Sequence, residues 1–457
     1  MTYNDLEPDA RSGIPLYRQL YFSIREAVET GRLGKGDRLP SIRRLSEDLS
    51  LSCTTVESAY QQLCVEGFIR SEPQKGYFVE TFGGNTTERP LFSPPDSDQL
   101  KDSHILYNFG TDCVDSENSD AKIWRRHIRE ILNRQEVIAS YGNHQGELEL
   151  RVALSKYSYG ARGVAASPEQ IVIGAGTQPL LNILCGLLGN RDKRVAMEEP
   201  GFRQAEQVFG DCGFTVLKLP GDRDGIRMDA LRDCGADIVY VMPSNRVRTG
   251  SSIPMNRRFE LLEWAERTGG VVIEDDHNGE LRYRAHPIPA MQGIGGAESV
   301  VYLGSFSKLL LPSVRIGYMA LTPALLERYL PRAENYNQTA SKIEQLALGG
   351  YIESGQMERH LRRLRKLYGA KSERLIKALG NAFGEKVTIL LQETPLCLIL
   401  SLRTSASAGE LCRLAREKGV RVLPAGDGEK LLLGFAGIPL EDIGSAVSLL
   451  KEAWKKT

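Results

Sequence analysis

The first part of the chain shows apolar residues at helical spacing. In "PLYRQLYFSIREAVETGRL", Leu16, Leu20, Ile24 and Val28 recur every four residues with polar positions between them. This spacing predicts an amphipathic helix. Pro15 suits its first turn, where no backbone N–H is needed.

Two further helices and a hairpin are predicted before residue 80. "LPSIRRLSEDLS" predicts a helix with Ser41 as its N-cap. "CTTVESAYQQLCVEGF" predicts another helix, which Gly67 ends. "FIRSEPQKGYFVE" has the strand–turn–strand pattern of a hairpin. Three helices and a hairpin are typical of a winged helix-turn-helix, although the helix pattern alone fits a generic three-helix bundle equally well.

The pattern changes beyond residue 80. Residues 81–105 are rich in Gly, Pro, Ser, Thr and Asp without a period, which predicts a linker between a domain at 11–80 and one at 106–457. Strands are expected at "QIVIGAG", "RVAME", "DIVYVMP", "GGVVIEDD" and "SVVYLGS". Buried strands separated by helices predict a parallel sheet in an α/β domain. The segment from about 330 to 457 looks like a smaller α+β subdomain.

Composition and charge narrow the possible partners. The chain has 457 residues, enough for two or three domains, with 58 basic and 58 acidic side chains. Residues 11–79 carry 10 Lys and Arg against 8 Asp and Glu, so any contact with DNA depends on where the basic groups lie and not on a global field. The 8 cysteines form no CxxC pair, which favours free thiols in a reducing compartment and no metal site. No apolar stretch approaches 18 residues, so we expect a cytoplasmic protein without a membrane partner.

The N-terminal pattern also carries a family resemblance. The run "LPSIRRLSEDLSLSCTTVESAYQQLCVEGFIRSEPQKGYFV" resembles the DNA-binding domain of GntR-type bacterial regulators. The resemblance implies double-stranded DNA as a partner, with one helix in the major groove and the hairpin at the minor groove or the backbone. The residues implied in DNA binding are Ser41, Arg43, Arg44, Thr54, Thr55, Lys75 and Gly76. Cys53 stands where the family usually has an arginine. Because a bidentate base contact is worth about 1–3 kcal/mol, this difference predicts a lower affinity or another base preference, unless a small residue is simply tolerated there.

Three short motifs in the second part suggest a cofactor site. Lys308 follows the strand "SVVYLG", Asp275 ends the strand in "GGVVIEDDHNG", and "IVIGAGTQ" joins a strand to a helix through a glycine turn. Each signal is weak alone, and Lys308 by itself would be read as a surface charge. Together they match what pyridoxal 5′-phosphate (PLP) needs: a lysine for its aldehyde, a carboxylate for its ring nitrogen, and donors for its phosphate.

Residues 106–457 resemble the fold type I aminotransferases, and the whole chain resembles the MocR subgroup of GntR regulators, which fuse these two modules. The resemblance implies that Lys308 forms a Schiff base with PLP, as the catalytic lysine, and that Asp275 pairs with the ring nitrogen. The other implied cofactor contacts are Ser305, Ser307 and Arg315 at the phosphate, Ala175, Gly176 and Thr177 in the turn before the helix, Phe202 stacked on the ring, and Tyr141 reaching the phosphate of the partner subunit.

Three departures from the aminotransferase pattern concern catalysis. His277 stands where the family usually has a tyrosine at the ring oxygen, and imidazole can still donate a hydrogen bond there. In "PSNRVRTG", Val247 and Arg248 replace an asparagine and a proline. "KLLLGFAG" offers Leu431–Leu433 where an arginine usually clamps the substrate carboxylate. The departures favour a cofactor site kept for sensing with weak or no turnover, and drift in one sequence is the alternative.

Three hypotheses remain from the sequence. The first is a transcription regulator that senses PLP or an amino compound, and for this the family implies a head-to-tail homodimer. The second is an active PLP-dependent aminotransferase with an appended DNA-binding module. The third is a binding protein without a cofactor, which would leave the spacing of Lys308, Asp275 and Arg315 unexplained.

Overall fold

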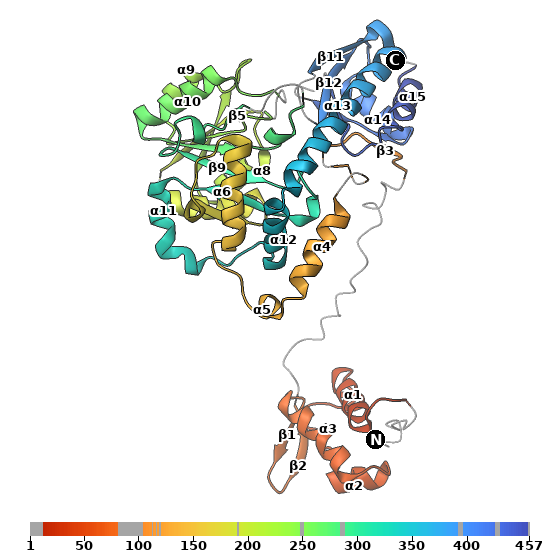
Figure 1. Ribbon diagram of the computed structural model, residues 1–457. Coiled ribbons are helices and arrows are strands. Elements are labelled where there is room, and N and C mark those ends of the chain that lie inside the picture. Colours follow the sequence, from red (N-terminus) through yellow and green to blue (C-terminus); the bar gives the residue numbers. More distant parts are fainter. Residues whose placement is uncertain are drawn as a thin grey trace. The chain divides into compact units, whose positions relative to one another are not determined.

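The computed structural model describes residues 12–80, 104–111, 113–115, 117, 120–189, 192–246, 251–283, 288–391, 396–425 and 430–455. The chain divides into two compact units, Met1–Lys101 and Asp102–Thr457, which we call the N-terminal and C-terminal units (Figure 1). Most of the expected linker, residues 81–103, lies outside the described residues. None of the described helices has the length and apolar character needed to cross a membrane.

The N-terminal unit is three helices followed by a hairpin. Its elements are α1 (Leu16–Glu29), α2 (Ile42–Asp48), α3 (Cys53–Val65), β1 (Ile69–Glu72) and β2 (Gly76–Val79). Leu20 and Ile24 of the expected apolar stripe are buried and pack with side chains of α2, α3 and the hairpin. Pro15 lies at the N-cap of α1, one residue before the first turn in which it was expected. Gly67, directly after the C-cap of α3, has a φ of +78°, the left-handed conformation that favours glycine at the end of a helix.

A seven-stranded sheet forms the centre of the described C-terminal unit. Its order is β4 (Ile171–Gly174), β10 (Gly317–Ala320), β9 (Val300–Ser305), β8 (Val271–Asp275), β7 (Ile238–Val241), β5 (Arg194–Glu199) and β6 (Thr215–Pro220). The five expected strands are present, whereas β6 and β10 were not expected. The expected parallel sheet contains one further strand, β10, which runs antiparallel to both of its neighbours. Only residues 306–316 separate β9 from β10, fewer than a parallel crossover connection needs.

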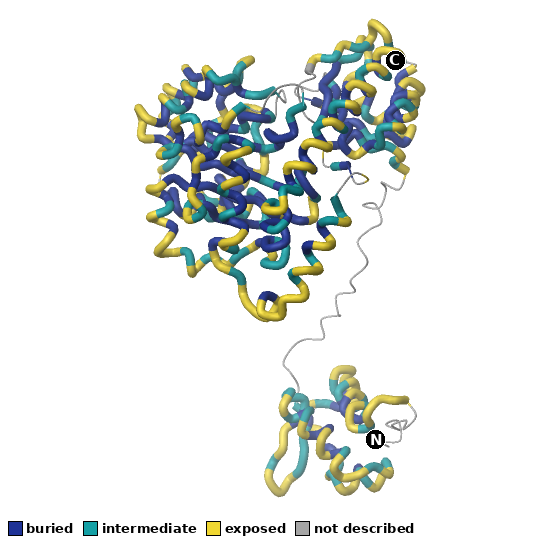
Figure 2. The backbone as a smooth tube through the Cα atoms, in the orientation of Figure 1, coloured by how far each residue is buried: buried dark blue, intermediate teal, exposed yellow. Residues whose placement is uncertain are grey.

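Helices cover both faces of this sheet, and alternate strand residues point to opposite faces. Ile238 and Tyr240 of β7 pack with side chains of the first face, whereas Val239 and Val241 pack with side chains of the second. Figure 2 shows the buried strands between the helical layers. The first face carries α7 (Thr177–Leu188), α8 (Arg203–Asp211) and α11 (Pro323–Tyr329), and the second carries α6 (Leu148–Arg162), α9 (Met228–Asp233) and α10 (Met255–Thr268).

The last part of the chain adds a smaller antiparallel sheet. Its order is β11 (Val387–Leu391), β12 (Cys397–Leu402), β15 (Lys430–Gly434) and β14 (Leu423–Ala425). The short strand β3 (Tyr107–Asn108) pairs with β13 (Val420–Arg421), so the start of the unit joins its end. The remaining helices are α4 (Ala121–Leu132), α5 (Gln135–Ile138), α12 (Lys342–Glu353), α13 (Gln356–Phe383), α14 (Ala408–Glu417) and α15 (Ile443–Ala453). Helix α12 packs against α4 and α6.

Candidate cofactor and DNA-binding sites

Strand pairing brings the three candidate cofactor motifs to one edge of the sheet. Gly317 at the start of β10 pairs with Gly174 at the end of β4 and with Ser305 at the end of β9. Asp275 ends β8, which runs parallel to β9, and Asp275 pairs with Leu303. The ends of β4, β8 and β9 therefore lie together, at the edge where open α/β sheets bind ligands.

The turn before α7 forms a cradle whose backbone conformation favours glycine. Gly176 has a φ of +93° and lies at the N-cap of α7, just before Thr177. A Cβ atom on Gly176 would lie 2.9 Å from Nη2 of Arg315. The guanidinium of Arg315 thus approaches the backbone at the N-terminus of a helix. A helix N-terminus and a cation together favour an anion such as a phosphate. The N–H of Ala175 is donated to Oγ1 of Thr339, at 2.9 Å.

Asp275 is buried without a cation from the described part of the chain bound to it. It is 3 % exposed, and its Oδ2 accepts a hydrogen bond of 2.5 Å from the hydroxyl of Tyr240. Burial raises the pKa of Asp275 above its usual value, although the neighbouring His277 and the Tyr240 hydrogen bond oppose this. A positively charged group at this carboxyl would stabilise its ionised form.

Asp276, the next residue, has the opposite environment. Its carboxylate accepts hydrogen bonds from Nε of Arg162 at 2.5 Å, from Oγ of Ser244 at 2.5 Å and from the hydroxyl of Tyr302 at 2.9 Å. Burial alone would raise the pKa of Asp276, but the charge and the hydrogen bonds of Arg162 outweigh burial and lower it. Arg162 is 2 % exposed, so this ion pair lies inside the protein.

Lys308 lies in the turn after β9, at the same edge as Asp275 and Arg315. Its side chain is half-buried, and its Nζ donates a hydrogen bond of 2.8 Å to the carbonyl oxygen of Thr111. Thr111 is 197 residues earlier in the chain. The amine is therefore held at the cofactor edge by a backbone group that no local motif in the sequence could indicate.

The remaining expected cofactor residues differ in their surroundings. The hydroxyls of Ser305 and Ser307 are 3.0 Å apart, directly before Lys308. Phe202 lies at the N-cap of α8 and lines a small cavity together with Tyr240, the partner of Asp275. His277 is half-buried, two residues beyond the end of β8. Tyr141 is fully exposed, and the structure does not bring it together with the other cofactor residues of its own chain.

The three departures are described in part. Leu431 and Leu433 of β15 are 1 % and 0 % exposed and belong to the hydrophobic core, and Leu432 is half-buried between them. Residues 247–250, including Val247 and Arg248, lie outside the described residues. Arg246, just before them, is buried and forms an ion pair with Glu198 that the sequence did not indicate.

In the N-terminal unit, side-chain caps fix the starts of α2 and α3. Ser41 Oγ accepts a hydrogen bond of 3.3 Å from the N–H of Arg44, as expected for an N-cap. Ser52 caps α3, and its Oγ lies 2.8 Å from Oγ1 of Thr54 and 2.7 Å from Oγ1 of Thr55. Arg43, Arg44, Cys53 and Thr54 are exposed, and Thr55 is half-buried. These side chains lie on α2 or in the first turn of α3.

The hairpin tip combines a paired lysine with an arginine that was not expected. Lys75 forms an ion pair of 3.2 Å with Glu72, so part of its charge is compensated. Gly76 has a φ of +113°, and a Cβ atom there would lie 3.5 Å from Nε of Arg38. Arg38 therefore places a further cation beside the hairpin. Arg38 lies between α1 and α2 in the sequence, far from the hairpin motif.

Comparison with known proteins matches both units. Residues 16–79 match the family described as bacterial regulatory proteins, gntR family, and residues 107–447 match aminotransferase class I and II. The HTH-type transcriptional regulator YdeL of Bacillus subtilis is 35% identical, with 97% of each chain covered. The HTH-type pyridoxine biosynthesis transcriptional regulator PdxR of Corynebacterium glutamicum is 31% identical, with 82% of this chain and 81% of that protein covered.

A solved structure gives the same result for the C-terminal unit. The α-aminoadipate aminotransferase LysN of Thermus thermophilus, complexed with N-(5′-phosphopyridoxyl)-L-leucine, matches with a TM-score of 0.68 and 25% identity, covering 78% of this chain and 93% of that one. Both parts of this chain, in this order, are thus found in one group of regulators. The chain belongs to the MocR-like HTH-type transcriptional regulators, in which a GntR DNA-binding domain precedes a class I and II aminotransferase domain.

Proposed function

We propose that this regulator binds promoter DNA through residues 11–80 and PLP through residues 106–457, and that PLP or an amino compound is its signal. The observation that carries the proposal is the pairing of Gly317 with both Gly174 and Ser305, which gathers the cofactor motifs at one edge. As a protein that acts on chromosomal DNA in bacteria, it would work in the cytoplasm.

The residues at this edge fit PLP in kind. Arg315 and the backbone around Gly176 at the start of α7 would hold the phosphate, with Ala175, Thr177, Ser305 and Ser307 beside it. Asp275, buried and without a cation among the described residues, would hold the ring nitrogen, and the ring would lie near Phe202 and His277. Bound PLP would supply an aldehyde for the amine of Lys308, for which an amino compound can compete.

Weak or absent turnover is part of the proposal. Leu431 and Leu433 are core residues of β15, so neither side chain is available to a substrate. Binding an α-carboxylate is the natural task of an arginine fork, and the leucines cannot perform it. A site that keeps a lysine, a carboxylate and a phosphate cradle without this clamp suits binding better than efficient transamination.

The signal is either PLP itself or a small amine. The name of the similar PdxR protein connects that regulator to pyridoxine biosynthesis, which supports PLP as the signal for this chain.

Tyr141 is fully exposed at the surface, as expected for a side chain that completes the phosphate site of a partner subunit. We therefore propose a homodimer with a head-to-tail arrangement.

The proposal is tested by measuring binding to the protein's own promoter with and without PLP. We expect PLP to change the affinity or the footprint of the wild-type protein and to leave a Lys308→Ala variant unaffected. A Lys451→Ala variant, which removes an exposed lysine of α15, serves as the control and should respond like the wild type. An identical response of wild type and Lys308→Ala would contradict a signal read through Lys308.

A panel of amino acids and other small amines, added to the PLP-loaded protein, distinguishes the sensor from the aminotransferase. The sensor should show changed absorbance on amine binding with little release of keto acid. Steady release of keto acid from a common amino acid would favour the enzyme.

A further inference from the structure

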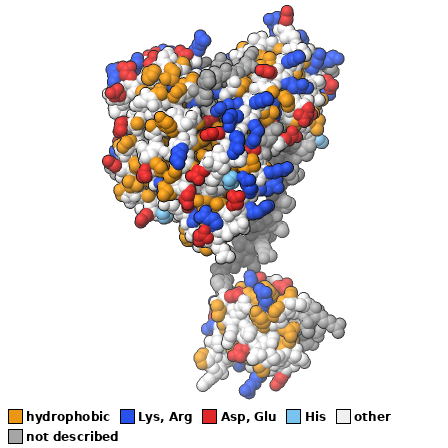
Figure 3. Space-filling model, viewed as in Figure 1, with side chains coloured by type: hydrophobic (Ala, Val, Ile, Leu, Met, Phe, Trp, Pro, Cys, Tyr) orange, Lys and Arg blue, Asp and Glu red, His pale blue; other side chains and the backbone are white. Residues whose placement is uncertain are grey.

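Basic side chains gather on one surface of the C-terminal unit. Figure 3 shows Lys and Arg concentrated over α13 and the neighbouring α4. In a chain whose 58 basic and 58 acidic residues cancel, such a concentration makes a local positive field. The exposed basic residues of this surface include Lys122, Arg125, Arg126 and Arg129 on α4, and Arg359, Arg362, Arg363 and Lys366 on α13.

A cleft lies beside this basic surface, between α6 and α13. Its volume is about 290 Å³, and its lining includes Lys156, Arg362 and Arg365, with Glu358 as the one carboxylate. Gly160 borders open space on the α6 side of the cleft, since a Cβ atom there would have nothing within 4 Å. Three cations against one carboxylate give the lining a formal charge of +2.

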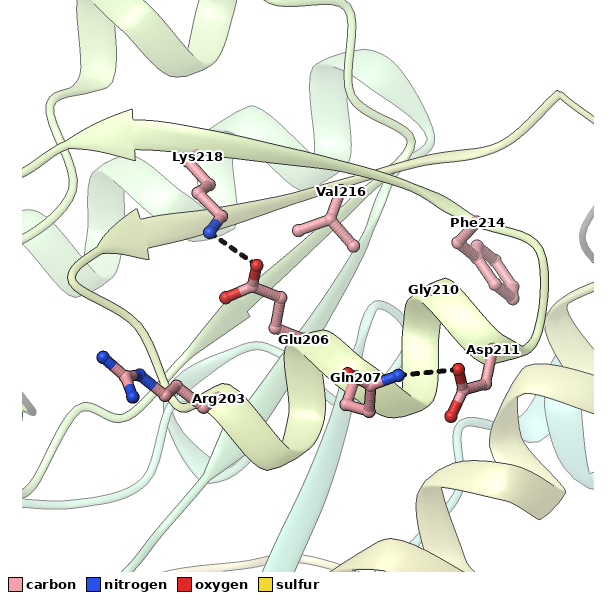
Figure 4. A pocket seen from close by; sticks show the side chains of 8 residues that line it. All are labelled: Arg203, Glu206, Gln207, Gly210, Asp211, Phe214, Val216 and Lys218. Atoms are coloured by element: carbon pink, nitrogen blue, oxygen red, sulfur yellow. Dashed lines mark hydrogen bonds and ion pairs between the residues drawn. The ribbon is translucent and has the colours of Figure 1, made fainter.

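A larger cleft elsewhere in the C-terminal unit has a lining in which positive and negative charges balance. The cleft of about 640 Å³ between α8 and β6 has two cations and two carboxylates in its lining (Figure 4). There, Lys218 pairs with Glu206 at 2.5 Å, and Gln207 bonds to Asp211 at 2.7 Å. In the cleft between α6 and α13, by contrast, neither Lys156 nor Arg362 forms an ion pair or hydrogen bond with another described residue.

The inner end of the α6–α13 cleft is hydrogen-bonded to Glu280, in the segment that follows Asp276. Nε of Arg365 donates a hydrogen bond of 2.6 Å to the carbonyl oxygen of Glu280, which leaves the Nη groups for a ligand. Tyr157, in the lining, donates from its hydroxyl to Oε1 of Glu280 at 3.4 Å. The other oxygen of Glu280 is buried without a partner among the described residues. Glu280 is four residues beyond Asp276, in the turn that follows the cofactor carboxylate.

We propose that the cleft between α6 and α13 binds a phosphate group through Lys156, Arg362 and Arg365. The lining carries +2, which fits a phosphate monoester of about −1.5 to −2 at pH 7 and also fits two neighbouring DNA phosphates, each with one negative charge. Arginine forks match phosphate oxygens in a bidentate way. The phosphate can come from the DNA backbone, because the cleft adjoins the basic surface of α13, or from a small phosphorylated molecule. The DNA source rests on the proposed function as a DNA-binding regulator.

The DNA source is tested by the salt dependence of promoter binding by the full-length protein. Each phosphate contact contributes about 0.9 to the slope of log affinity against log salt. A double variant Lys156→Glu and Arg362→Glu should reduce the slope by about 2 relative to wild type. Arg232→Glu, which reverses an exposed charge on α9, is the control and should leave the slope unchanged. Preference for the promoter over unrelated DNA should persist in every variant, and its loss would count against the proposed function and not against the cleft.

The small-molecule source is tested by titrating the PLP-loaded protein with pyrophosphate in a calorimeter. The double variant should bind pyrophosphate about tenfold more weakly than wild type, because two exposed charges are reversed. Glu358→Gln should bind it more tightly, since it removes the only carboxylate of the lining. A changed slope alone assigns the site to DNA, and a changed pyrophosphate affinity alone assigns it to a small phosphorylated ligand. If both the slope and the pyrophosphate affinity of the double variant equal those of Arg232→Glu, the proposal is wrong.

Discussion

Asp275 and Asp276 are neighbours in the sequence, and both are buried, yet their surroundings differ. Asp276 has its cation inside the chain, since Arg162 pairs with it in the interior. Asp275 has Tyr240 as a hydrogen-bond donor but no cation bound to it among the described residues, and burial raises its pKa. This difference is what we expect if Asp276 is a structural carboxylate, whose cation the chain supplies, and Asp275 a binding carboxylate, whose ligand brings the charge. Cations elsewhere in the molecule differ in the same way: some have a partner of opposite charge among the described residues and others do not.

The largest expected effect comes from exchanging the two aspartates for asparagine. Asp276→Asn leaves Arg162 buried without its carboxylate, and breaking a buried pair costs about 3–5 kcal/mol of unfolding free energy. Asp275→Asn keeps a hydrogen-bonding group for Tyr240 and should cost about 1 kcal/mol or less without cofactor. Urea unfolding of both variants measures the difference. Equal losses would remove the distinction between the two carboxyl groups.

The second-largest effect is expected for a substitution in the cradle at the start of α7, which should weaken PLP binding. Gly176→Ala forces a Cβ atom to 2.9 Å from Nη2 of Arg315 and strains a residue with φ +93°. We expect PLP to bind at least about tenfold more weakly, because the Cβ atom displaces the guanidinium of Arg315 from the proposed phosphate site.

Gly189→Ala is a matched control for this change. Gly189 lies at the other end of α7 with φ +72°, and a Cβ atom there would meet nothing within 4 Å. The control should lose stability without losing affinity for PLP, as measured by fluorescence titration. A similar loss of PLP affinity in both variants would mean that the cradle does not hold the phosphate.

The pH dependence of stability tests the buried network next to Asp276. Burial, together with the charge of Asp276, raises the pKa of Glu280 from 4.5 to about 7, and burial raises the pKa of Glu274 to about 7. Between these values the folded protein holds protons that the unfolded chain releases, so stability falls as pH rises from 4.5 to about 7 and is level above. One such group contributes a slope of up to about 1.4 kcal/mol per pH unit. Glu280→Gln should therefore reduce the fall, as measured by calorimetric melting temperatures across this pH range.

The smallest effect distinguishes two cations of the N-terminal unit. Arg43 is exposed and forms no ion pair with another described residue, whereas Lys75 is paired with Glu72. Arg43→Ala should lower the salt slope of DNA binding by about 1, whereas Lys75→Ala should lower it by less. Gel-shift titrations at several salt concentrations measure both slopes. An equal or larger change for Lys75→Ala would show that the pair with Glu72 opens on DNA.

Much of the fold follows from the sequence because apolar runs mark buried strands. The runs at β4, β5, β7, β8 and β9 are continuous and were expected, and Ser41 was correctly expected as a cap. β10 was missed because "GYMA" is a short run directly after another motif. Because β10 was not expected, the sequence could not indicate that Gly317 pairs with the ends of both β4 and β9.

The candidate site followed from the sequence only in its residue types. The motifs indicated Lys308, Asp275 and Arg315, but the partners that position them are distant in the chain. Tyr240 lies 35 residues from Asp275, and Thr111 lies 197 residues from Lys308. Such pairings depend on the three-dimensional arrangement of strands and turns, and no local pattern encodes them.

The most direct test of the central claim is to locate the cofactor on the chain. The protein is incubated with PLP, reduced with borohydride to fix the cofactor to the amine that holds it, and digested for peptide mass spectrometry. The account predicts one modified peptide, containing Lys308, and none at this position when Arg315→Ala and Asp275→Asn are combined under dilute PLP. Stable modification at another lysine, or none at Lys308, would contradict the claim that this sheet edge is a cofactor site.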